Sequence, residues 1–364
     1  MNSPGLYVHT PFCPRRCAYC DFYSTENLSK IPMWLDSLAV EARQQAAYWT
    51  YEFDSLYLGG GSPSVLSPDQ LASLKEALSP LKISPKAEIT LEANPEDVTA
   101  DKALAWAEWG VTRVSIGAQS FQRKALIAPL GRSHSDSDIL KAVEAVKKAK
   151  LFFGLDLIFG WPGQTSQEWR EDLELAVATG TGHISTYELT IPHKSPIAQK
   201  FLTGELIALP ESEIADLFLL AGSYLKKRGF ERYEVSNFAR KGAYSRHNLK
   251  YWRRDAYLGL GPAAHSFDGS RRSANVASVD KWSLALAQRH TALSLLEDLT
   301  PDQARLESLM LCLRLAQGAP TSLINDQGKA AELALAGFLV KNGAYWKPTE
   351  KGLLCADYLA RELS

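Results

Sequence analysis

The first half of the chain alternates short apolar runs with longer stretches in which apolar residues recur every three to four positions. The short runs are typical of buried β-strands and the longer ones of amphipathic helices. Strand followed by helix, repeated six times, predicts parallel strands joined by right-handed crossovers. The predicted strands are Leu6–His9, Ser55–Leu58, Glu88–Glu92, Arg113–Ile116, Phe153–Ile158 and His183–Leu189, and the predicted helices between them are Ile31–Trp49, Pro68–Leu78, Ala100–Trp109, Ser137–Ala149 and Ser166–Thr179.

Six strand–helix units indicate an α/β fold of a particular kind. They favour an open or partial (β/α)6 barrel, similar to a TIM barrel, over a closed barrel of eight units. In such barrels chemistry gathers at the carboxyl ends of the strands. The segment Gly59–Ser62 and the residues Glu92, Gln119 and Asp156 each end or follow a predicted strand, so we expect them to line one site.

The pattern changes near residue 200. A helical stretch, Glu211–Arg228, leads into a polar and aromatic segment over 237–266, and the chain beyond about residue 295 reads as helical. Gly337–Trp346 and Thr349–Leu359 suggest a strand pair followed by a helix, as in a winged-helix cap. We therefore expect a partial barrel over 1–200, a barrel extension over 201–290, and a smaller, mainly helical C-terminal domain over 291–364.

Composition narrows the class of protein. Hydrophobic residues make up 46% and charged residues 22%, which describes a soluble globular chain. The formal net charge is −1, so no nucleic-acid partner is expected. No signal sequence or membrane-spanning run is visible, and the five cysteines are too unevenly placed for a secreted disulfide framework. A cytoplasmic protein with a thiolate-ligated metal site is the expectation.

Three of the cysteines carry the strongest chemical signal. Cys13, Cys17 and Cys20 form a C-x3-C-x2-C pattern in the loop after the first predicted strand. Three thiolates on one loop can converge on an iron–sulfur cubane and leave its fourth iron without a protein ligand. A Cys3His zinc site that includes His9 is the alternative. The remote Cys312 and Cys355 are interpreted as buried small apolar residues.

The cysteine spacing, with Tyr19 before the last cysteine, resembles the radical SAM superfamily. The resemblance implies a [4Fe–4S] cluster whose open iron is chelated by the amino and carboxylate groups of S-adenosylmethionine. It also implies that Tyr7 lies beside the cluster and that the glycine loop contacts the methionine amino group. The residues implied in cofactor binding are Tyr7, Gly60, Gly61, Ser62, Glu92, Gln119, Arg132 and Asp156.

Within that superfamily the run from Tyr7 to Ser266 is similar to the oxygen-independent coproporphyrinogen III oxidase group of porphyrin metabolism and to its heme chaperone branch. The dehydrogenases usually carry a fourth cysteine at the position of Phe22, so its absence counts against that enzymatic activity. The segment Arg246–Trp252 matches the HNxxYW motif of the chaperone branch. A radical enzyme that decarboxylates a porphyrinogen remains the alternative, and whether the chain is an enzyme stays open.

The resemblance also implies partners. His247 is the candidate heme ligand, because imidazole ligates heme iron and the neighbouring aromatic rings can stack on a porphyrin. A hydrogen-bonded structural histidine is the competing interpretation, and His265 is the next candidate. Heme would be the cargo, and apo-hemoproteins, including respiratory enzymes at the membrane, would receive it. A homodimer and peripheral contact with the membrane during delivery are further implications, with the C-terminal domain covering the barrel mouth or docking a partner.

Overall fold

The computed structural model describes residues 3–193 and 195–364. The described chain divides into two compact units. The first unit contains the described residues of Met1–Asp156, Thr190–Leu206 and Asp255–Asp298, and the second contains Leu157–Leu189, Ile207–Arg254 and Leu299–Ser364. Among the described residues, no helix combines the length and the apolar character that crossing a bilayer requires.

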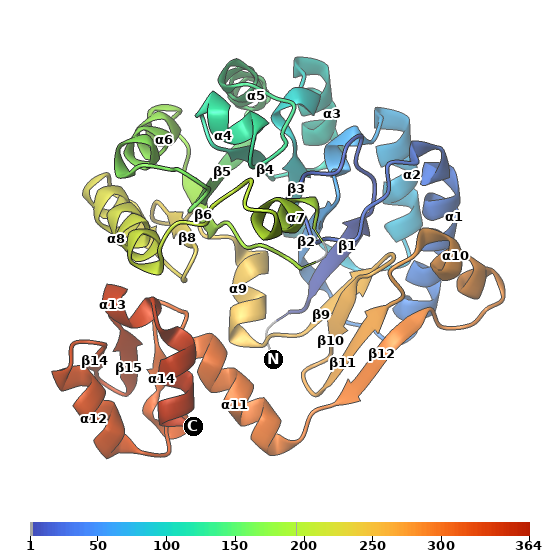
Figure 1. The fold of residues 1–364 in the computed structure, drawn as a ribbon. Helices are drawn as coiled ribbons and strands as arrows, with labels where there is room; N and C mark the ends of the chain where they lie inside the picture. The colour runs from blue at the N-terminus through green and yellow to red at the C-terminus, as the bar shows by residue number, and fades with distance from the viewer. Residues whose placement is uncertain (1–2, 194) are drawn as a thin grey trace. The chain divides into compact units, whose positions relative to one another are not determined.

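The sheet of the first unit is built around its first strand. β1 pairs in parallel with β2 on one side and with β9 on the other (Figure 1). Parallel pairing continues from β2 to β3 and β4, whereas β9 to β12 are antiparallel to one another, so the sheet is mixed. The order is β12-β11-β10-β9-β1-β2-β3-β4. The strands are β1 (Gly5–Thr10), β2 (Phe53–Gly60), β3 (Ile83–Ala93), β4 (Arg113–Gln119), β9 (Tyr257–Leu260), β10 (His265–Phe267), β11 (Arg271–Asn275) and β12 (Leu293–Asp298).

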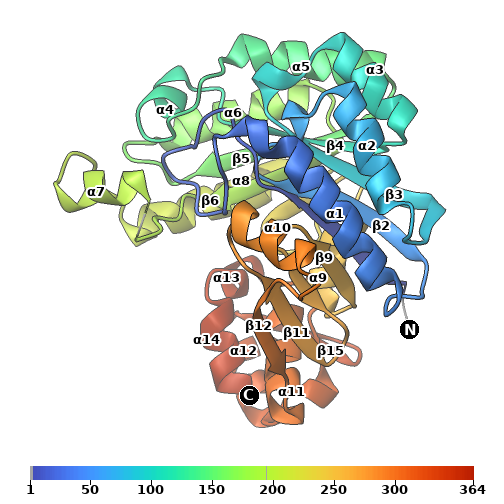
Figure 2. The same cartoon turned by 90° about the vertical axis from the view of Figure 1, so that its right-hand side faces the viewer.

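The helices of the first unit begin where the sequence supplies caps. Ser67 and Gln70 form a capping box at the start of α2, as do Ser135 and Asp138 at the start of α5, and each box satisfies backbone N–H groups that the first helical turn leaves unpaired. α10 lies beside α1 (Figure 2). The helices are α1 (Ile31–Ala46), α2 (Pro68–Leu78), α3 (Ala100–Trp109), α4 (Arg123–Ile127), α5 (Asp136–Lys148), α7 (Pro196–Leu202) and α10 (Val279–Ala287), with short 3₁₀ turns η1 (Leu28–Lys30), η2 (Pro63–Val65) and η3 (Pro95–Asp97).

The second unit begins within β5 (Phe152–Phe159). In this unit β8 pairs antiparallel with both β6 and β7. The Arg232 guanidinium lies over the rings of Phe218 and Phe238 and forms an ion pair with Glu350 at 3.1 Å, which ties α8 and β8 to α13. The elements are β6 (His183–Glu188), β7 (Glu231–Arg232), β8 (Asn237–Ala239), α6 (Ser166–Ala178), α8 (Glu211–Lys227) and α9 (Arg246–Arg253).

The C-terminal part of the second unit combines helices with a small antiparallel sheet of order β13-β15-β14. Leu309, Leu333, Trp346 and Leu363 belong to its buried core. Cys312 and Cys355 pack against this core but are only partly buried, so the prediction that both are buried holds in part. The elements are α11 (Pro301–Cys312), β13 (Ala319–Pro320), η4 (Thr321–Leu323), α12 (Gln327–Leu335), β14 (Leu339–Asn342), β15 (Tyr345–Pro348), α13 (Glu350–Leu353) and α14 (Ala356–Leu363).

The predicted α/β alternation is confirmed, because all six predicted strands are present as β1 to β6. The four strands β9 to β12 were not predicted. Leu293–Asp298, at the edge of the stretch expected to be helical, forms β12 because it pairs with β11 over five residue positions. The division into three domains expected from the sequence stays a prediction.

Candidate functional site

The cysteine loop follows β1 and is closed by backbone hydrogen bonds. Cys13 N donates to Thr25 O at 3.1 Å, and Thr25 N donates to Pro11 O at 2.7 Å, so the two ends of the loop are held together. Cys20 N donates to Cys17 O at 3.3 Å, which makes a tight turn between the second and third cysteines. The fold thus presents all three thiols from one closed loop at the carboxyl end of β1.

Two thiols of this loop, those of Cys13 and Cys20, have pKa values raised above the ordinary cysteine value. Burial raises the pKa of Cys13, and the nearby Cys17 adds to that increase. Burial also raises the pKa of Cys20, with Cys17 and Cys13 contributing. These mutual effects place the three sulfurs in one neighbourhood. A cationic iron cluster would supply the charge that thiolates need there, so the loop suits such a group.

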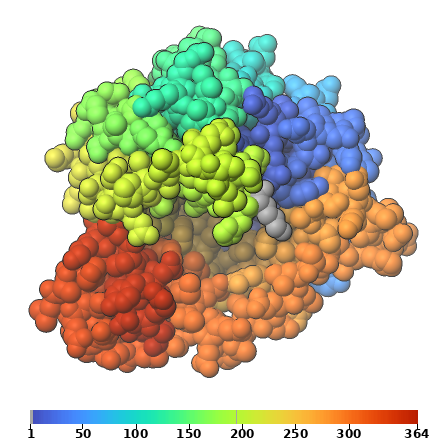
Figure 3. Space-filling view, in the orientation of Figure 1, coloured from blue at the N-terminus to red at the C-terminus, as the bar shows by residue number. Residues whose placement is uncertain are grey.

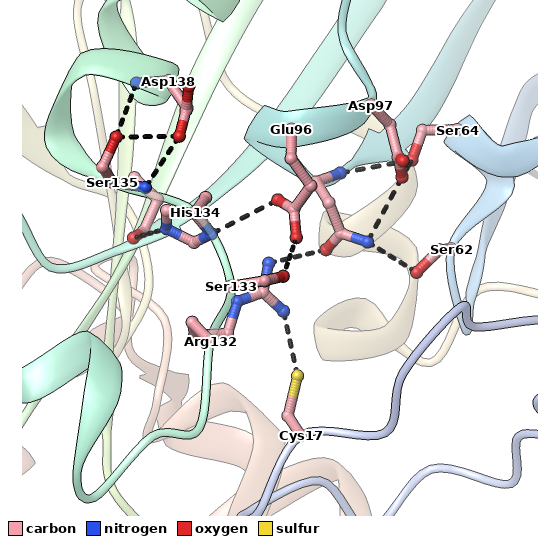
Figure 4. Close-up of polar contacts among 12 residues, drawn as sticks. Cys17, Ser62, Ser64, Glu96, Asp97, Arg132, Ser133, His134, Ser135 and Asp138 are labelled. Atoms are coloured by element: carbon pink, nitrogen blue, oxygen red, sulfur yellow. Dashed lines mark hydrogen bonds and ion pairs between the residues drawn. The ribbon is translucent and has the colours of Figure 1, made fainter.

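Two donors from other segments point at the thiols. Ser62 Oγ donates to Cys13 Sγ at 3.6 Å, and Arg132 Nη1 donates to Cys17 Sγ at 3.0 Å; the second contact is drawn in Figure 4. Ser62 follows β2, and Arg132 precedes α5. Donors of this kind around metal-binding sulfurs orient the ligands and set their electronic properties.

The glycine loop after β2 is joined to the cysteine loop by backbone hydrogen bonds. Gly61 N donates to Thr10 O and Ser62 N donates to Phe12 O, both at 2.8 Å. A Cβ on Gly61 would lie 2.7 Å from Thr10 O, and Gly60 has φ +105° with the His9 ring only 2.4 Å from its ideal Cβ position. Glycine is therefore required at both positions by the approach of β1 and its loop.

A histidine–tyrosine pair lies at the base of this arrangement. His9 Nε2 is 2.8 Å from Tyr23 O, and His9 Nδ1 is 3.0 Å from Tyr7 Oη. Burial lowers the pKa of His9 to about 4, so the ring is neutral near pH 7. Because a carbonyl only accepts, Nε2 carries the proton and Nδ1 accepts from the Tyr7 hydroxyl. Tyr7 is thereby fixed on the face of β1 that also carries His9.

Two carboxyl groups lie toward the carboxyl ends of β3 and β5. Glu92 accepts hydrogen bonds from Tyr57 Oη at 2.7 Å and from Gly60 N at 3.1 Å. Burial raises the pKa of Glu92 to about 7, and the negative charge of Asp156 contributes. Asp156 in turn accepts from Ser115 Oγ at 2.8 Å. The structure therefore brings Glu92 and Asp156 near one another at the carboxyl ends of the strands, as expected from the sequence.

Gln119 and Arg132 complete this edge. Gln119 ends β4 in the left-handed region, with φ +63°, which is uncommon for a residue with a side chain. Its Nε2 would lie 2.7 Å from a Cβ on Gly117, and Arg132 Nη2 would lie 3.9 Å from the same point, so both side chains face Gly117. Arg132 Nε is buried and has no hydrogen-bond partner among the described residues, which leaves a donor for an anionic group.

A further segment of the first unit contacts the cysteine loop. Ile197 N, at the start of α7, donates to Ala18 O at 3.0 Å, between the second and third cysteines. The space-filling view places this part of the chain, in yellow-green, against the N-terminal segment in blue (Figure 3). The loop is therefore supported from both β2 and α7.

The candidate heme residue lies in the second unit. His247 is 1% exposed, and its Nε2 is 2.9 Å from the hydroxyl of Tyr251, one turn further along α9. Burial lowers the pKa of His247 to about 3, with Lys250 contributing, so the imidazole is neutral. His265, in β10 of the first unit, is exposed. The pairing of His247 with Tyr251 was not predicted, although the two residues are spaced four apart, as residues on one face of a helix are.

A polar network near the cysteine loop was also not predicted. Asn94, Glu96 and Asp97 follow β3 and connect Ser62, Ser64, Arg132, Ser133 and His134 (Figure 4). The available signal was Asn94, a polar residue two positions after the predicted strand Glu88–Glu92. Over residues 3–193 and 195–364, no set of three or more His, Cys, Asp or Glu side chains is arranged to hold a single metal ion.

Comparison with known proteins decides the family. The sequence profile of the Radical SAM superfamily matches residues 7–176. Heme chaperone HemW of Mycobacterium tuberculosis is 35% identical to this chain, with 99% of the chain and 94% of the relative covered. This chain belongs to the HemW family of the radical SAM superfamily. Heme chaperone HemW of Bacillus subtilis is 31% identical, covering 86% of the chain and 84% of the relative.

The fold comparison agrees with this assignment. The solved structure of coproporphyrinogen III oxidase HemN from Escherichia coli, a radical SAM enzyme, superimposes with a TM-score of 0.85 at 20% identity, covering 99% of this chain and 90% of that one. This match confirms the predicted α/β fold class, and the identity to the HemW relatives confirms the family resemblance. Membership of the radical SAM superfamily implies a [4Fe–4S] cluster and S-adenosylmethionine.

Proposed function

We propose that this chain is a heme chaperone, which binds heme and delivers it to acceptor proteins. The observation that carries the proposal is the 35% identity to a heme chaperone HemW over 99% of the chain. Phe22 adds support from the sequence, since it stands where the coproporphyrinogen dehydrogenases resembled by this chain carry a further cysteine.

The cluster is assigned to Cys13, Cys17 and Cys20. Their common loop, their mutual electrostatic influence and the donors Ser62 and Arg132 support this assignment. When bound, the cluster supplies an open iron for S-adenosylmethionine and a site for one-electron reduction. Iron and acid-labile sulfide of about four each per chain are expected after anaerobic reconstitution, and one metal ion without sulfide would instead indicate the zinc alternative.

S-adenosylmethionine is assigned to the polar edge of the first unit's sheet. Its carboxylate would meet the unpartnered donor of Arg132, and its amino and ribose groups would meet the carboxyls of Glu92 and Asp156. The residues proposed to hold it are Tyr7, Gly60, Gly61, Ser62, Glu92, Gln119, Arg132 and Asp156. In this chain Ser62 also donates to Cys13, and the Gly60 N–H is already directed to Glu92.

Heme is assigned to the segment around His247. The neutral imidazole is the form that ligates iron, which favours His247, but its Nε2 is 2.9 Å from the Tyr251 hydroxyl and the ring is buried. Ligation through that nitrogen requires the Tyr251 hydroxyl to move away. The nearby Lys250 is buried as well, so the exposed Arg246 is the better candidate to meet a heme propionate.

An anaerobic heme titration of the cluster-loaded protein, followed by the Soret band, tests this assignment. His247→Ala is expected to weaken heme binding at least tenfold, whereas His265→Ala, which removes an exposed imidazole, leaves it unchanged. Tyr251→Phe removes only the hydroxyl that competes for His247 and is expected not to weaken binding. Weak binding in Tyr251→Phe together with normal binding in His247→Ala would reassign the ligand to Tyr251, and unsaturable binding by the unsubstituted protein would refute the chaperone proposal.

The alternative function is oxidative decarboxylation of coproporphyrinogen III. Incubation with coproporphyrinogen III, S-adenosylmethionine and a reductant under anaerobic conditions separates the two functions. We expect no vinyl-bearing product from this chain. Formation of such a product at turnover above one per chain would establish the enzyme instead.

The partners and location follow from the chaperone proposal. Acceptor apo-hemoproteins, respiratory enzymes of the membrane among them, would take heme from a cytoplasmic carrier that touches the membrane only during delivery. A homodimer is part of the same proposal. Mixing heme-loaded protein with a heme-free acceptor and following the shift of the Soret band tests the transfer step.

A further inference from the structure

Asn94 occupies a branching point between two of the three cysteines. Its Oδ1 accepts from Arg132 Nη2 at 2.6 Å, and its Nδ2 donates to Ser62 Oγ at 2.8 Å. Ser62 donates to Cys13 Sγ, which the Ser24 side chain also contacts, and Arg132 donates to Cys17 Sγ, which the Tyr19 hydroxyl also contacts. One side chain that touches neither sulfur thus contacts both donors.

The orientation of the Asn94 amide is determined by its partners. Arginine only donates, so the oxygen of the amide must face Arg132. The amide nitrogen then faces Ser62 and Asp97, whose Oδ2 is 3.4 Å away and accepts. Asp97 is held in turn by Ser64 Oγ at 2.7 Å. Both ends of the amide agree, so the assignment of oxygen and nitrogen does not depend on one contact.

The direction of this hydrogen bond controls the hydroxyl of Ser62. A serine hydroxyl has one proton to donate and two lone pairs that accept. Because Asn94 Nδ2 donates to Ser62 Oγ, the serine proton remains available for Cys13 Sγ. A side chain at position 94 that accepted from Ser62 would draw this proton away from the sulfur.

Arg132 depends on Asn94 in a different way. The guanidinium is anchored by Asn94 Oδ1 and directs Nη1 to Cys17. The backbone of Arg132 is held by the preceding turn, because Arg132 N donates to Leu126 O at 2.7 Å. Glu96 accepts from Ser133 Oγ at 2.6 Å and lies 3.3 Å from His134 Nδ1, which fixes the two residues that follow.

We propose that Asn94 is a positioning residue that holds the Ser62 hydroxyl on Cys13 and the Arg132 guanidinium on Cys17, and so sets the reduction potential of the cluster that these cysteines carry. Hydrogen bonds to cluster sulfurs stabilise the reduced, more negative state and raise the potential. The inference rests on the proposed cluster assignment and not on heme binding.

The nearly isosteric substitution Asn94→Asp separates the contact with Ser62 from the contact with Arg132. The carboxylate still accepts from Arg132 but now accepts from Ser62 as well, so the serine proton leaves Cys13. The added negative charge also lowers the potential, whether or not Ser62 is present. A double-mutant cycle with Ser62→Ala cancels this charge contribution, because it is the same in both backgrounds. Ser37→Ala is the matched control, because this buried hydroxyl of the same unit donates to Met33 O and touches no thiol.

The measurement is a redox titration of the [4Fe–4S] cluster in the full reconstituted chain, without S-adenosylmethionine, followed by electron paramagnetic resonance. Ser62→Ala is expected to reduce the electron affinity about tenfold, a shift of about 59 mV to more negative potential for a one-electron couple. In the unsubstituted chain, Asn94→Asp is expected to shift the potential further than Ser62→Ala does. In a chain that already carries Ser62→Ala, the shift caused by Asn94→Asp is expected to be much smaller. Ser37→Ala is expected to leave the potential unchanged.

Equal shifts by Asn94→Asp with and without Ser62 would overturn the proposal, since charge alone would then explain them. Absence of any shift in Ser62→Ala would overturn it too, as would an Asn94→Asp protein that folds but binds no cluster. If Asn94→Asp does not fold, Asn94→Ala replaces it in the same cycle. An unsubstituted chain that binds no four-iron cluster would refute the cluster assignment, whereas normal potentials with failed heme binding would refute only the chaperone proposal.

Discussion

At the scale of single residues, the site was predictable where chemistry is concentrated in adjacent letters of the sequence. Cys13, Cys17 and Cys20 stand within one loop, and their spacing favoured an iron–sulfur cubane, with a zinc site as the alternative. Asn94 was not predictable in this way, because its role comes from contacts with Ser62 and Arg132 in two other loops. The burial of His247 was equally invisible, since it depends on how α9 packs.

The cysteine assignment makes a direct prediction. Replacing Cys13, Cys17 or Cys20 singly by Ser should reduce bound iron to a small fraction of the unsubstituted level after reconstitution, because three thiolates are the minimum that holds a cubane with one open iron. Cys312→Ser is the matched control, since its thiol packs against the C-terminal core. Iron and sulfide analysis measures both. Full iron in any of the three loop variants would exclude that residue as a ligand.

At the scale of elements, the sequence predicted strands that alternate with helices and missed strands that depend on partners. β1 to β6 are marked by local apolar runs, and all five helices predicted between these strands begin at the observed start or within one residue of it. β9 to β12 are short or polar, and their strand character comes from antiparallel pairing with neighbours that local sequence does not reveal. Leu293, Leu295 and Leu296 are compatible with either structure.

One buried carboxyl joins α1 to this unforeseen part of the sheet. Glu41 accepts from Gly261 N, just beyond β9, at 2.7 Å and from Asn275 Nδ2 in β11 at 2.6 Å. Burial raises the pKa of Glu41 to about 7, so the folded state holds the proton more tightly than the unfolded chain. Its contribution to the free energy of unfolding is therefore largest below about pH 4.5, falls as the pH rises to about 7, and is level above that.

Glu41→Gln removes this titration and should destabilise the protein by about 1–3 kcal/mol, because an amide cannot accept at both positions. Relative to the variant, the unsubstituted protein should lose about 1–3 kcal/mol of stability between about pH 5 and about pH 8. Urea denaturation at the two pH values measures the difference. A stability difference that does not change with pH would show that Glu41 titrates normally.

The small C-terminal sheet depends on a glycine between α11 and β13. Gly318 has φ +79°, and a Cβ there would lie 2.2 Å from Trp346 O in β15. Gly318→Ala should reduce the free energy of unfolding by about 2–4 kcal/mol, through both the left-handed backbone and the clash. Gly343→Ala, at φ +59° with open space around it, should reduce it by about 1–2 kcal/mol. Chemical denaturation compares the two, and equal effects would mean that the clash relaxes freely.

At the scale of the whole molecule, the two compact units divide the proposed binding functions. All cysteine-loop and polar-edge residues assigned to the cluster and to S-adenosylmethionine belong to the first unit, and His247 belongs to the second. The comparisons that established the family extend across this division, with 99% of the chain aligned to one relative. Sequence alone predicted the kinds of residue involved, but the division into units follows from tertiary contacts among distant segments.

This division predicts a calorimetric signature. A ligand stabilises the part of a protein that binds it, by RT ln(1 + [L]/Kd). Cluster loading should raise the temperature of one unfolding transition, and heme should raise that of another. Differential scanning calorimetry of the cluster-free, cluster-loaded and heme-loaded protein checks this. A single transition that moves with both ligands would show that the units unfold together, and a heme effect that persists in His247→Ala would place heme elsewhere.

The exposed side chain of Phe22 has an evolutionary consequence. It follows Cys20 by two positions, and 66% of its surface is accessible to water. Exchanging such a residue perturbs little packing, so folding imposes almost no selection on what stands there. A lineage could acquire or abandon a sulfur at this point of the loop while the scaffold remained intact.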